Sequence, residues 1–401
     1  MNTQPDSSAQ NSCPEENKHI PLCVPEIRGN EWKYVKDCLD TSWVSSVGDY
    51  VNRFEDMLKQ KAECDHAVAT VNGTSALHIA LLVAGVRPDD EVLVSNLTFI
   101  APANAIRYAG AWPLFIDAEE QFWQMDVQQA VDFLEQGCEW KDGNLYNKVT
   151  DRRIGAVLPV HILGHPVEMQ PLLEAARKFE LPVIEDATES LGASYQGKMT
   201  GSLGDIACFS FNGNKLITTG GGGMITTSRE DWSGKARYLT TQAKDDEVEY
   251  CHHEIGYNYR LTNVQAAMGC AQMELVDEYI LAKHRIAERY RDGLSDLPGL
   301  TLMRQAEWAQ SVWWMYTIQI DERQFGCGSR DLLKHLQQNN IQTRPLWQPM
   351  HLSPAHTQTS RLKYDVSEKL YREALSLPCS VGLSESDQQR VINEIHQACA
   401  R

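Results

Sequence analysis

The chain has 401 residues, which is more than one hydrophobic core usually supports, so we expect two lobes. Hydrophobic residues make up 42% and charged residues 23%, as in a soluble globular protein, and no apolar run approaches the ~18 residues that would cross a membrane. The net charge of -17 argues against a protein that binds nucleic acid through a basic face.

Residues 1–18 are polar and lack the apolar stretch of a secretory signal, so they are predicted to form a disordered leader. Eleven cysteines are scattered along the chain, without a CxxC pair or a zinc-like spacing to histidine. This pattern predicts free thiols in a reducing cytoplasm and no metal site.

From residue 66 onward, short β-rich runs alternate with helix-length segments. Strands are predicted at 66–71, 91–95, 112–118, 154–162, 181–187, 206–211 and 224–228. Helices are predicted between several of them, at 74–86, 101–110 and 169–180. The alternation is typical of an α/β fold with a mainly parallel sheet and helices on both faces, here in a large domain over 19–259.

The pattern changes in the last third of the chain. A helical stretch over 263–294, a strand over 313–320 and a helix over 329–340 predict a smaller C-terminal α+β domain over 260–401. A last helix follows, with Ser384 as its N-cap. The polar insertion 137–151, between a predicted helix and strand, has no evident chemical role.

The segment VNGTSALH (71–78) places a glycine and two hydroxyl residues where a strand gives way to a helix. A helix start presents unpaired N–H groups and the positive end of the helix dipole, which suit a phosphate group. Taken alone, the motif is explained better as an ordinary helix cap.

The segment VIEDATES (183–190) places Asp186 at the C-terminal end of a buried strand, where doubly wound sheets bind ligands. A carboxylate in such a place needs a cationic partner, because burying an unpaired charge is costly. A protonated pyridine nitrogen would be such a partner. An acidic residue that merely ends a strand is the plainer alternative.

The segment CFSFNGNKLITTGGGGMITT (208–227) is the most specific one. It places Lys215 in a polar turn between two apolar strands and follows it with the glycines 220–223. A partly desolvated lysine loses its proton more readily and becomes a nucleophile for aldehydes. The glycines would let the backbone approach a flat cofactor or a partner chain closely.

Together the three segments match a site for pyridoxal 5'-phosphate (PLP), with a phosphate cup, a carboxylate for the pyridine nitrogen and a Schiff-base lysine. Their order along the chain is that of the aspartate-aminotransferase-like fold, fold type I. From Ile20 onward the sequence resembles the DegT/DnrJ/EryC1/StrS sugar aminotransferases, through the segments 29–55, 72–81, 185–198, 209–225 and 256–269. The motifs FNGNKLITTGGGG, HILGHP (161–166) and IQTRPLWQPMHLSPAH (341–356) are most similar to transaminases of the legionaminic-acid type.

The resemblance implies how the cofactor is bound. Lys215 would hold PLP covalently and carry protons, and Asp186 would pair with the pyridine nitrogen. Phe99 would stack on the cofactor ring. The phosphate would be held by Gly73, Thr74, Ser75, Ser210 and, from the neighbouring subunit of a homodimer with shared active sites, Asn258.

The resemblance also places Arg344 and His351 in the segment that lines the sugar-nucleotide pocket. For His161 a packed histidine and a substrate contact are equally compatible with the sequence, and Trp313 and Trp314 are expected in the core of the second lobe. Glu189 stands where many relatives have glutamine. Its carboxylate could bond a cofactor or sugar hydroxyl, or stay protonated, and both alternatives stay open.

The implied reaction is a two-stage transamination. PLP would take an amino group from L-glutamate and pass it to the C4 ketone of a UDP- or GDP-linked 4-keto-6-deoxy hexose, with a 2-acetamido group expected, for bacterial surface glycans or nonulosonic-acid precursors. A C3-aminotransferase acting on a 3-keto nucleotide sugar and a non-catalytic regulatory protein remain alternatives. A sugar dehydratase of this fold would replace the lysine with histidine, and a cysteine desulfurase would need an activated cysteine loop.

Overall fold

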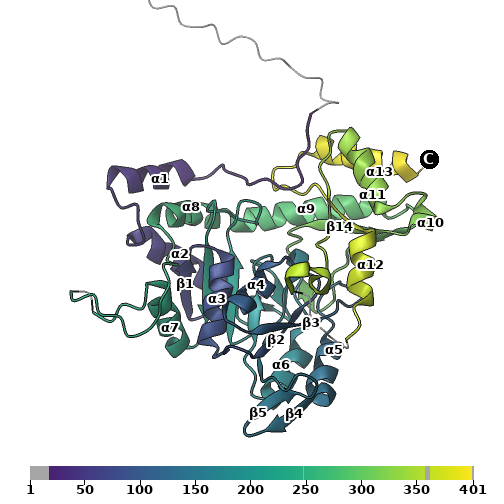
Figure 1. Ribbon diagram of the computed structural model, residues 1–401. Helices are drawn as coiled ribbons and strands as arrows, with labels where there is room; N and C mark the ends of the chain where they lie inside the picture. Colours follow the sequence, from purple (N-terminus) through teal and green to yellow (C-terminus); the bar gives the residue numbers. More distant parts are fainter. Residues whose placement is uncertain (1–17, 247, 357–361, 400–401) are drawn as a thin grey trace, which may run out of the picture.

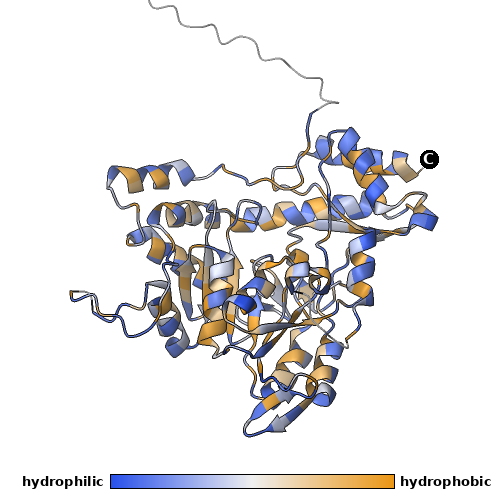
Figure 2. Cartoon of the chain, in the orientation of Figure 1, coloured by the Kyte–Doolittle hydropathy of each residue, from blue (hydrophilic) through white to orange (hydrophobic). Residues whose placement is uncertain are grey.

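The computed structural model describes residues 18–246, 248–356 and 362–399, so the predicted leader lies outside these ranges except for Lys18. Figure 1 shows helices packed around a central sheet, with a second group of helices and strands beside it at the upper right. Hydrophobic residues are concentrated along the central strands (Figure 2).

The central sheet contains the order β1-β11-β10-β7 and the order β6-β2-β3, joined by parallel bridges between the segments of β6 and β7. Its strands are β1 (His66–Thr70), β2 (Glu91–Ser95), β3 (Trp112–Ile116), β6 (Ile154–Leu158), β7 (Ile184–Asp186), β10 (Ile206–Ser210) and β11 (Gly223–Thr227). Strand β11 runs antiparallel to both its neighbours, whereas the other described pairs are parallel. The prediction of a mainly parallel sheet is therefore confirmed.

Burial explains why these segments form strands without an alternating pattern. Every residue of β2, β6 and β11 is buried, as expected for strands that are covered on both faces. The helices of this lobe are α1 (Glu31–Asp40), α2 (Asp49–Ala62), α3 (Gly73–Val83), α4 (Ala101–Tyr108), α5 (Val127–Asp132), α6 (Met169–Lys178), α7 (Glu230–Thr240) and α8 (Asn263–Met273).

Helix α3 is the most enclosed of the helices that bear on the site. Residues 75–81 are all buried, and α3 contacts α4, α7, β10 and β11. Because neighbours surround it on several sides, its first turn is held at a fixed place beside the end of β10. This packing positions the predicted phosphate motif.

The second lobe has an antiparallel sheet in the order β12-β14-β16-β15. Its elements are α9 (Val276–Leu294), β12 (Leu300–Leu302), β14 (Tyr316–Ile320), α10 (Glu322–Phe325), α11 (Ser329–Gln338), β15 (Arg344–Pro345), α12 (Asp365–Glu373), β16 (Ala374–Leu377) and α13 (Glu385–Cys399). The hydroxyl of Ser384 accepts a hydrogen bond from the amide of Asp387 at 3.1 Å, which is the predicted helix cap. Strand β14 starts later than predicted, because Trp313 has a φ of 52° and turns the chain.

The predicted helix over 263–294 is divided into α8 and α9. Helix α8 packs against α1 and α2 of the first lobe, whereas α9 leads on to the second sheet (Figure 1). One hydrophobic cluster continues from α3 into β14 and α13, so the lobes share a core. The domain boundary at residue 260 stays a prediction.

The polar insertion forms a hairpin of β4 (Cys138–Lys141) and β5 (Asn144–Asn147), which follows a short π-helix, η2 (Phe133–Gly137). The hairpin lies at the lower end of the molecule in Figure 1. A small sheet of β8 (Ser194–Tyr195), β9 (Lys198–Met199) and β13 (Ala309–Gln310) links the lobes. Within the described ranges, no helix is both long and apolar enough to cross a membrane.

Candidate active site

A cavity of about 320 Å³ lies at the carboxyl ends of β7 and β10, where parallel sheets usually bind ligands. Most of its wall belongs to the first lobe, and two tryptophans, Trp314 and Trp347, come from the second. The predicted residues that line it are Gly73, Thr74, Phe99, Asp186, Glu189, Ser210 and Lys215. Segments more than 100 residues apart in the chain therefore meet here.

The phosphate motif begins with a helix cap. The side chain of Asn72 accepts a hydrogen bond from the amide of Ser75 at 2.8 Å, and α3 starts at Gly73. A Cβ added to Gly73 would lie 2.8 Å from Cβ of Ser210, so the glycine allows this turn to approach the end of β10. The hydroxyls of Thr74 and Ser210 thus belong to one wall, next to a helix N-terminus that suits a phosphate.

Ser75 is placed differently from the other residues of this motif. It is buried, its amide serves the Asn72 cap, and it does not line the cavity. Its predicted contact with a phosphate stays untested. The helix cap is therefore observed, and the phosphate site stays a prediction for the other atoms of the same turn.

Asp186 ends β7 and is 2% exposed. One carboxylate oxygen accepts a hydrogen bond from the amide of Thr188 at 3.1 Å. Burial raises the pKa of Asp186, although Thr188 and the more distant Lys215 act in the opposite direction. A cation facing this carboxylate would favour its charged form, and a protonated pyridine nitrogen meets that requirement.

Glu189 and Lys215 form an ion pair inside the cavity, with Lys215 Nζ 3.2 Å from Glu189 Oε1. The other carboxylate oxygen of Glu189 accepts a hydrogen bond from the amide of Leu163 at 2.8 Å. Burial raises the pKa of Glu189, while the nearby Lys215 lowers it. The sequence did not suggest this contact with Lys215, and the two roles that it left open for Glu189 stay untested.

Aromatic side chains complete the cavity. Phe99 lines it with 55% of its surface exposed, so its ring is available to a flat ligand or to a second chain. Trp314 is 3% exposed, as expected for the core, and yet its ring faces the cavity and lies 4.1 Å from Lys215 Nζ. This contact was not predictable from the sequence, because about 100 residues separate Trp314 from Lys215.

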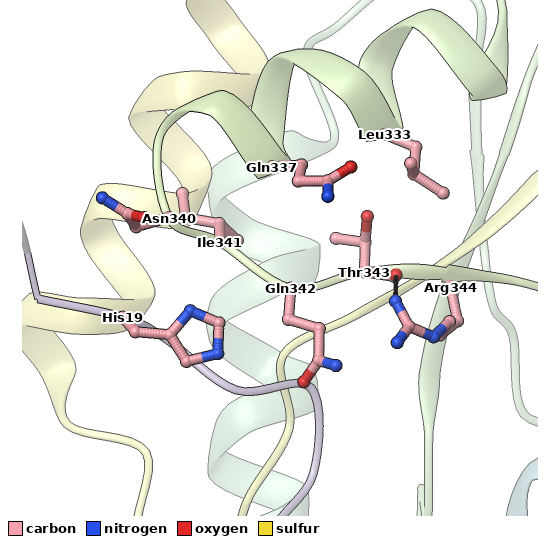
Figure 3. A pocket seen from close by; sticks show the side chains of 8 residues that line it. All are labelled: His19, Leu333, Gln337, Asn340, Ile341, Gln342, Thr343 and Arg344. Carbon is pink, nitrogen blue, oxygen red and sulfur yellow. Dashed lines mark hydrogen bonds between the residues drawn. The ribbon is translucent and has the colours of Figure 1, made fainter.

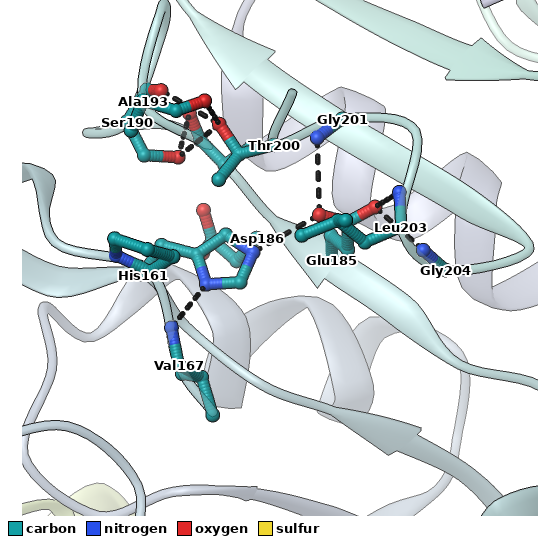
Figure 4. Close-up of polar contacts among 12 residues, drawn as sticks. His161, Val167, Glu185, Asp186, Ser190, Ala193, Thr200, Gly201, Leu203 and Gly204 are labelled. Carbon is teal, nitrogen blue, oxygen red and sulfur yellow. Dashed lines mark hydrogen bonds and ion pairs between the residues drawn. The ribbon is translucent and has the colours of Figure 1, made fainter. Parts of the chain in front are cut away.

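His161 does not reach the cavity. It is completely buried, and its Nε2 lies 3.0 Å from Glu185 while its Nδ1 accepts a hydrogen bond from the amide of Val167 (Figure 4). Glu185 also accepts hydrogen bonds from the amides of Gly201, Leu203 and Gly204. Both ring nitrogens of His161 are thus engaged by the protein, which corresponds to the packed alternative rather than to a substrate contact.

Arg344 lies in a separate hollow of about 340 Å³ (Figure 3). Its guanidinium donates a hydrogen bond to the carbonyl of Thr343 at 3.0 Å, and the buried hydroxyl of Thr343 has no hydrogen-bond partner among the described residues. The Nδ1 atom of His351 is hydrogen-bonded to the side chain of Asn96, and its Nε2 lies 3.2 Å from Oε1 of Glu368. Neither Arg344 nor His351 lines the cavity that holds Lys215.

Asn258 is exposed and lies outside the cavity. It sits between Tyr257 and Tyr259, whose rings stack at 5.1 Å and pack against His78 of α3. The segment is therefore well held, but it does not complete the site of its own chain. No group of three or more His, Cys, Asp or Glu suited to a metal occurs among the residues described.

Comparisons with known proteins agree with this arrangement. The model of the DegT/DnrJ/EryC1/StrS aminotransferase family matches residues 25–396. GDP-perosamine synthase of Caulobacter vibrioides is 41% identical over 381 residues, covering 94% of this chain and 98% of that protein. GDP-perosamine synthase of Escherichia coli O157:H7 is 36% identical and covers 95% and 98%. Among solved structures, DesV of Streptomyces venezuelae is 29% identical with a TM-score of 0.82, covering 93% and 95%.

Proposed function

The chain belongs to the DegT/DnrJ/EryC1/StrS aminotransferase family and is a PLP-dependent nucleotide-sugar transaminase, and we propose that it aminates C4 of a 4-keto-6-deoxy hexose. The observation that supports this most is the meeting of Lys215, Asp186 and the Gly73 turn in one cavity. L-Glutamate is the proposed amino donor.

The residues of the cavity fit PLP. The Gly73 turn lies beside the hydroxyls of Thr74 and Ser210, since a glycine lets it approach the end of β10 closely. Asp186 is a buried carboxylate that forms no ion pair with a side chain of the described residues. When bound, PLP supplies the electron sink that lets an amino group pass between the donor and the sugar carbon. Asp186 would keep the pyridine nitrogen protonated, and Thr74 and Ser210 would hold the phosphate.

Lys215 would carry the proton in each half of the reaction. Its Nζ reaches into the cavity and donates a hydrogen bond to Glu189 at 3.2 Å. This contact would bring the flexible side chain to the same position in both halves of the reaction. The buried Trp314 and the partly buried Trp347 would reduce the access of water to this amine. Phe99 would cover the cofactor ring from the open side.

For the nucleotide carrier, we favour GDP over UDP, because two relatives that match almost the whole chain are named for a GDP-linked sugar. The legionaminic-type substrate, a UDP- or GDP-linked 2-acetamido sugar, is the competing candidate. We assign the hollow around Arg344 to the nucleotide end of the substrate, since its lining offers donor groups and a guanidinium but no carboxylate among the described residues. His351 stays a proposed contact of the sugar.

The deciding experiment is a panel of GDP- and UDP-linked 4-keto-6-deoxy sugars, with and without a 2-acetamido group, incubated with L-glutamate and read by mass. We expect amination to depend on glutamate and to be absent with Lys215→Ala. Arg344→Gln should raise the KM for the nucleotide sugar and leave the half-reaction with glutamate unchanged. Amination of 3-keto sugars alone would replace the C4 assignment by C3, and no amination at all would favour a regulatory protein.

We also propose that the chain works as a homodimer. Several large apolar side chains are exposed, on α1, on the loop after it and on other segments. They include Trp32, Trp43, Val47, Phe99, Tyr108, Tyr250 and Ile255. Exposed apolar groups of this size often mark a protein interface. In a two-fold dimer the exposed Asn258 of each chain would reach the phosphate site of the other.

A further inference from the structure

Trp314 holds the segment of the catalytic lysine in two ways. The face of its ring lies 4.1 Å from Lys215 Nζ, which is a cation–π contact. The edge of the same ring donates a hydrogen bond from Nε1 to the carbonyl of Asn214 at 2.8 Å. One side chain therefore contacts both the amine of Lys215 and the backbone just before it.

Trp314 is itself fixed from the second lobe. Its carbonyl accepts a hydrogen bond from Lys283 Nζ of α9 at 2.9 Å, and Lys283 also donates to the carbonyl of Cys379. Lys283 is 1% exposed, and it forms no ion pair with a carboxylate within the described ranges. Burying an ammonium is costly, so its hydrogen bonds to two carbonyls are the compensation that the fold provides.

Cys23 strengthens the same arrangement. Its thiol donates a hydrogen bond to the carbonyl of Asn214 at 3.4 Å, and its sulfur lies 3.9 Å from Lys283 Nζ. The carbonyl that precedes Lys215 is thus bound by groups from two distant parts of the chain. The turn of the lysine is therefore anchored at the carbonyl of Asn214.

A transaminase lysine must leave its covalent bond to the cofactor and then act as a free amine. A free lysine has four rotatable side-chain bonds, so it loses much of its catalytic advantage unless its position is restricted. Glu189 restricts the ammonium from one side, at 3.2 Å, and the Trp314 ring restricts it from another. The two contacts differ in kind. The carboxylate of Glu189 pairs with the charged amine, whereas the ring of Trp314 attracts the amine and also shields it from water.

We propose that Trp314 is a positioning residue for Lys215, holding its amine near the reacting carbon while it is free, and that Lys283 fixes Trp314 for this purpose. The inference rests on the proposed role of Lys215. It concerns Trp314 and Lys283, neither of which the family resemblance singled out.

The test compares Trp314→Leu, which removes the ring, with Trp314→Phe, which keeps a ring but loses the indole N–H. Trp313→Phe is the matched control, because it changes the adjacent tryptophan, which does not line the cavity. We expect kcat to fall about 100-fold in Trp314→Leu and about 10-fold in Trp314→Phe, with KM for the nucleotide sugar within about 3-fold. Trp313→Phe should keep the wild-type kcat.

A second readout needs no cofactor. In protein stripped of PLP, the amine of Lys215 is labelled by reductive methylation with formaldehyde, and the rate is read by peptide mass relative to Lys61 and Lys198. Trp314→Leu should raise the relative labelling of Lys215 several-fold at an unchanged melting temperature. Lys283→Met should have the same effect without altering any residue of the cavity wall; if that variant does not fold, the two Trp314 variants decide alone.

The possible outcomes separate the two proposals. Full activity of Lys215→Ala would overturn the proposed role of the lysine itself. An inactive Lys215→Ala protein together with wild-type kcat and wild-type Lys215 labelling in Trp314→Leu would overturn only the positioning role of Trp314. A general rise in labelling at all three lysines, with a lower melting temperature, would mean that Trp314 is structural and would also contradict the proposal.

Discussion

Burial decides what the individual polar residues of this site can do. Asp186 and Glu189 lie close in sequence and are both almost fully buried, but they have different neighbours. Glu189 faces the ammonium of Lys215, whereas Asp186 is bound by the amide of Thr188 and faces the cavity. Asp186, which forms no ion pair among the described residues, is the carboxylate suited to a cationic cofactor atom.

Asp186→Asn should therefore slow proton removal more than it weakens the binding of PLP. The amide has the shape of the carboxylate but no charge, so it cannot stabilise a protonated pyridine nitrogen. We expect the half-reaction with glutamate to slow by at least ~10²-fold in stopped-flow absorbance, while the Kd for PLP changes less. Glu185→Gln would be a poor control because Glu185 binds three amides; Asp89→Asn on the surface is suitable. An unchanged half-reaction would mean that another residue stabilises the ring.

Several site residues were predictable because they belong to local motifs. Gly73, Thr74, Asp186 and Lys215 are next to strand ends or helix starts that hydrophobic patterning reveals. Ser210 was expected from the family resemblance, and all of these residues line the cavity. Others were not predictable. The sequence could not show that the amide of Ser75 donates its hydrogen bond to the helix cap Asn72, or that His161 faces the buried Glu185. The contact of Trp314 with Lys215 depends on packing between lobes, which leaves no local pattern.

At the scale of elements, the phosphate turn depends on how closely α3 and β10 approach each other. Gly73→Ala would place a methyl group 2.8 Å from Cβ of Ser210 and 3.3 Å from a methyl carbon of Thr188, so the start of α3 must move away. We expect PLP affinity to fall at least ~10-fold by equilibrium titration, since the amides at a helix start act over short distances.

Gly234→Ala provides the matched control for this prediction. Gly234 lies in α7, and a Cβ added there would meet no atom within 4 Å. This substitution should leave PLP affinity unchanged and stabilise the helix by about 0.5–1 kcal/mol, measured by denaturant unfolding. Wild-type PLP affinity in Gly73→Ala would show that the turn tolerates the extra atom and that the phosphate lies elsewhere.

The elements themselves were largely predictable, since the strands of the first lobe are short apolar runs bounded by turns. The exceptions have physical causes. The predicted helix over 263–294 divides at Glu274 and Leu275, because α8 packs on α1 and α2 whereas α9 follows the second lobe. The start of β14 moved to Tyr316 because Trp313 adopts a positive φ, a feature that its residue type does not suggest.

At the scale of the whole molecule, a homodimer should be inseparable from activity. A Lys215→Ala chain and an Asn258→Asp chain are each expected to be inactive, the second because an aspartate would repel the phosphate. In a mixed dimer one site would collect both changes and the other would collect neither. Mixing the two inactive proteins should therefore restore part of the activity, measured on hybrids verified by native mass spectrometry.

The controls follow from the same geometry. Neither protein alone should recover activity when it is unfolded and refolded by itself. Hybrids without activity would mean that Asn258 serves its own chain, and an active Asn258→Asp homodimer would contradict the shared site directly. A monomer by analytical ultracentrifugation that retains full activity would contradict the dimer proposal as a whole.

The division of the cavity wall between the lobes has a consequence for how such enzymes diversify. The residues proposed to bind PLP come from the first lobe, while the Arg344 hollow is lined by residues 333–344 of the second lobe together with His19. If this hollow holds the nucleotide end of the substrate, as proposed, changes within the segment 341–356 should alter substrate choice and leave the residues proposed to bind PLP unchanged. A chimera in which this segment is replaced by that of a relative with a different substrate should keep its half-reaction with glutamate. It should acquire the relative's preference among nucleotide sugars. Trp314 should not be exchanged with the second lobe, because its ring contacts Lys215 of the first lobe.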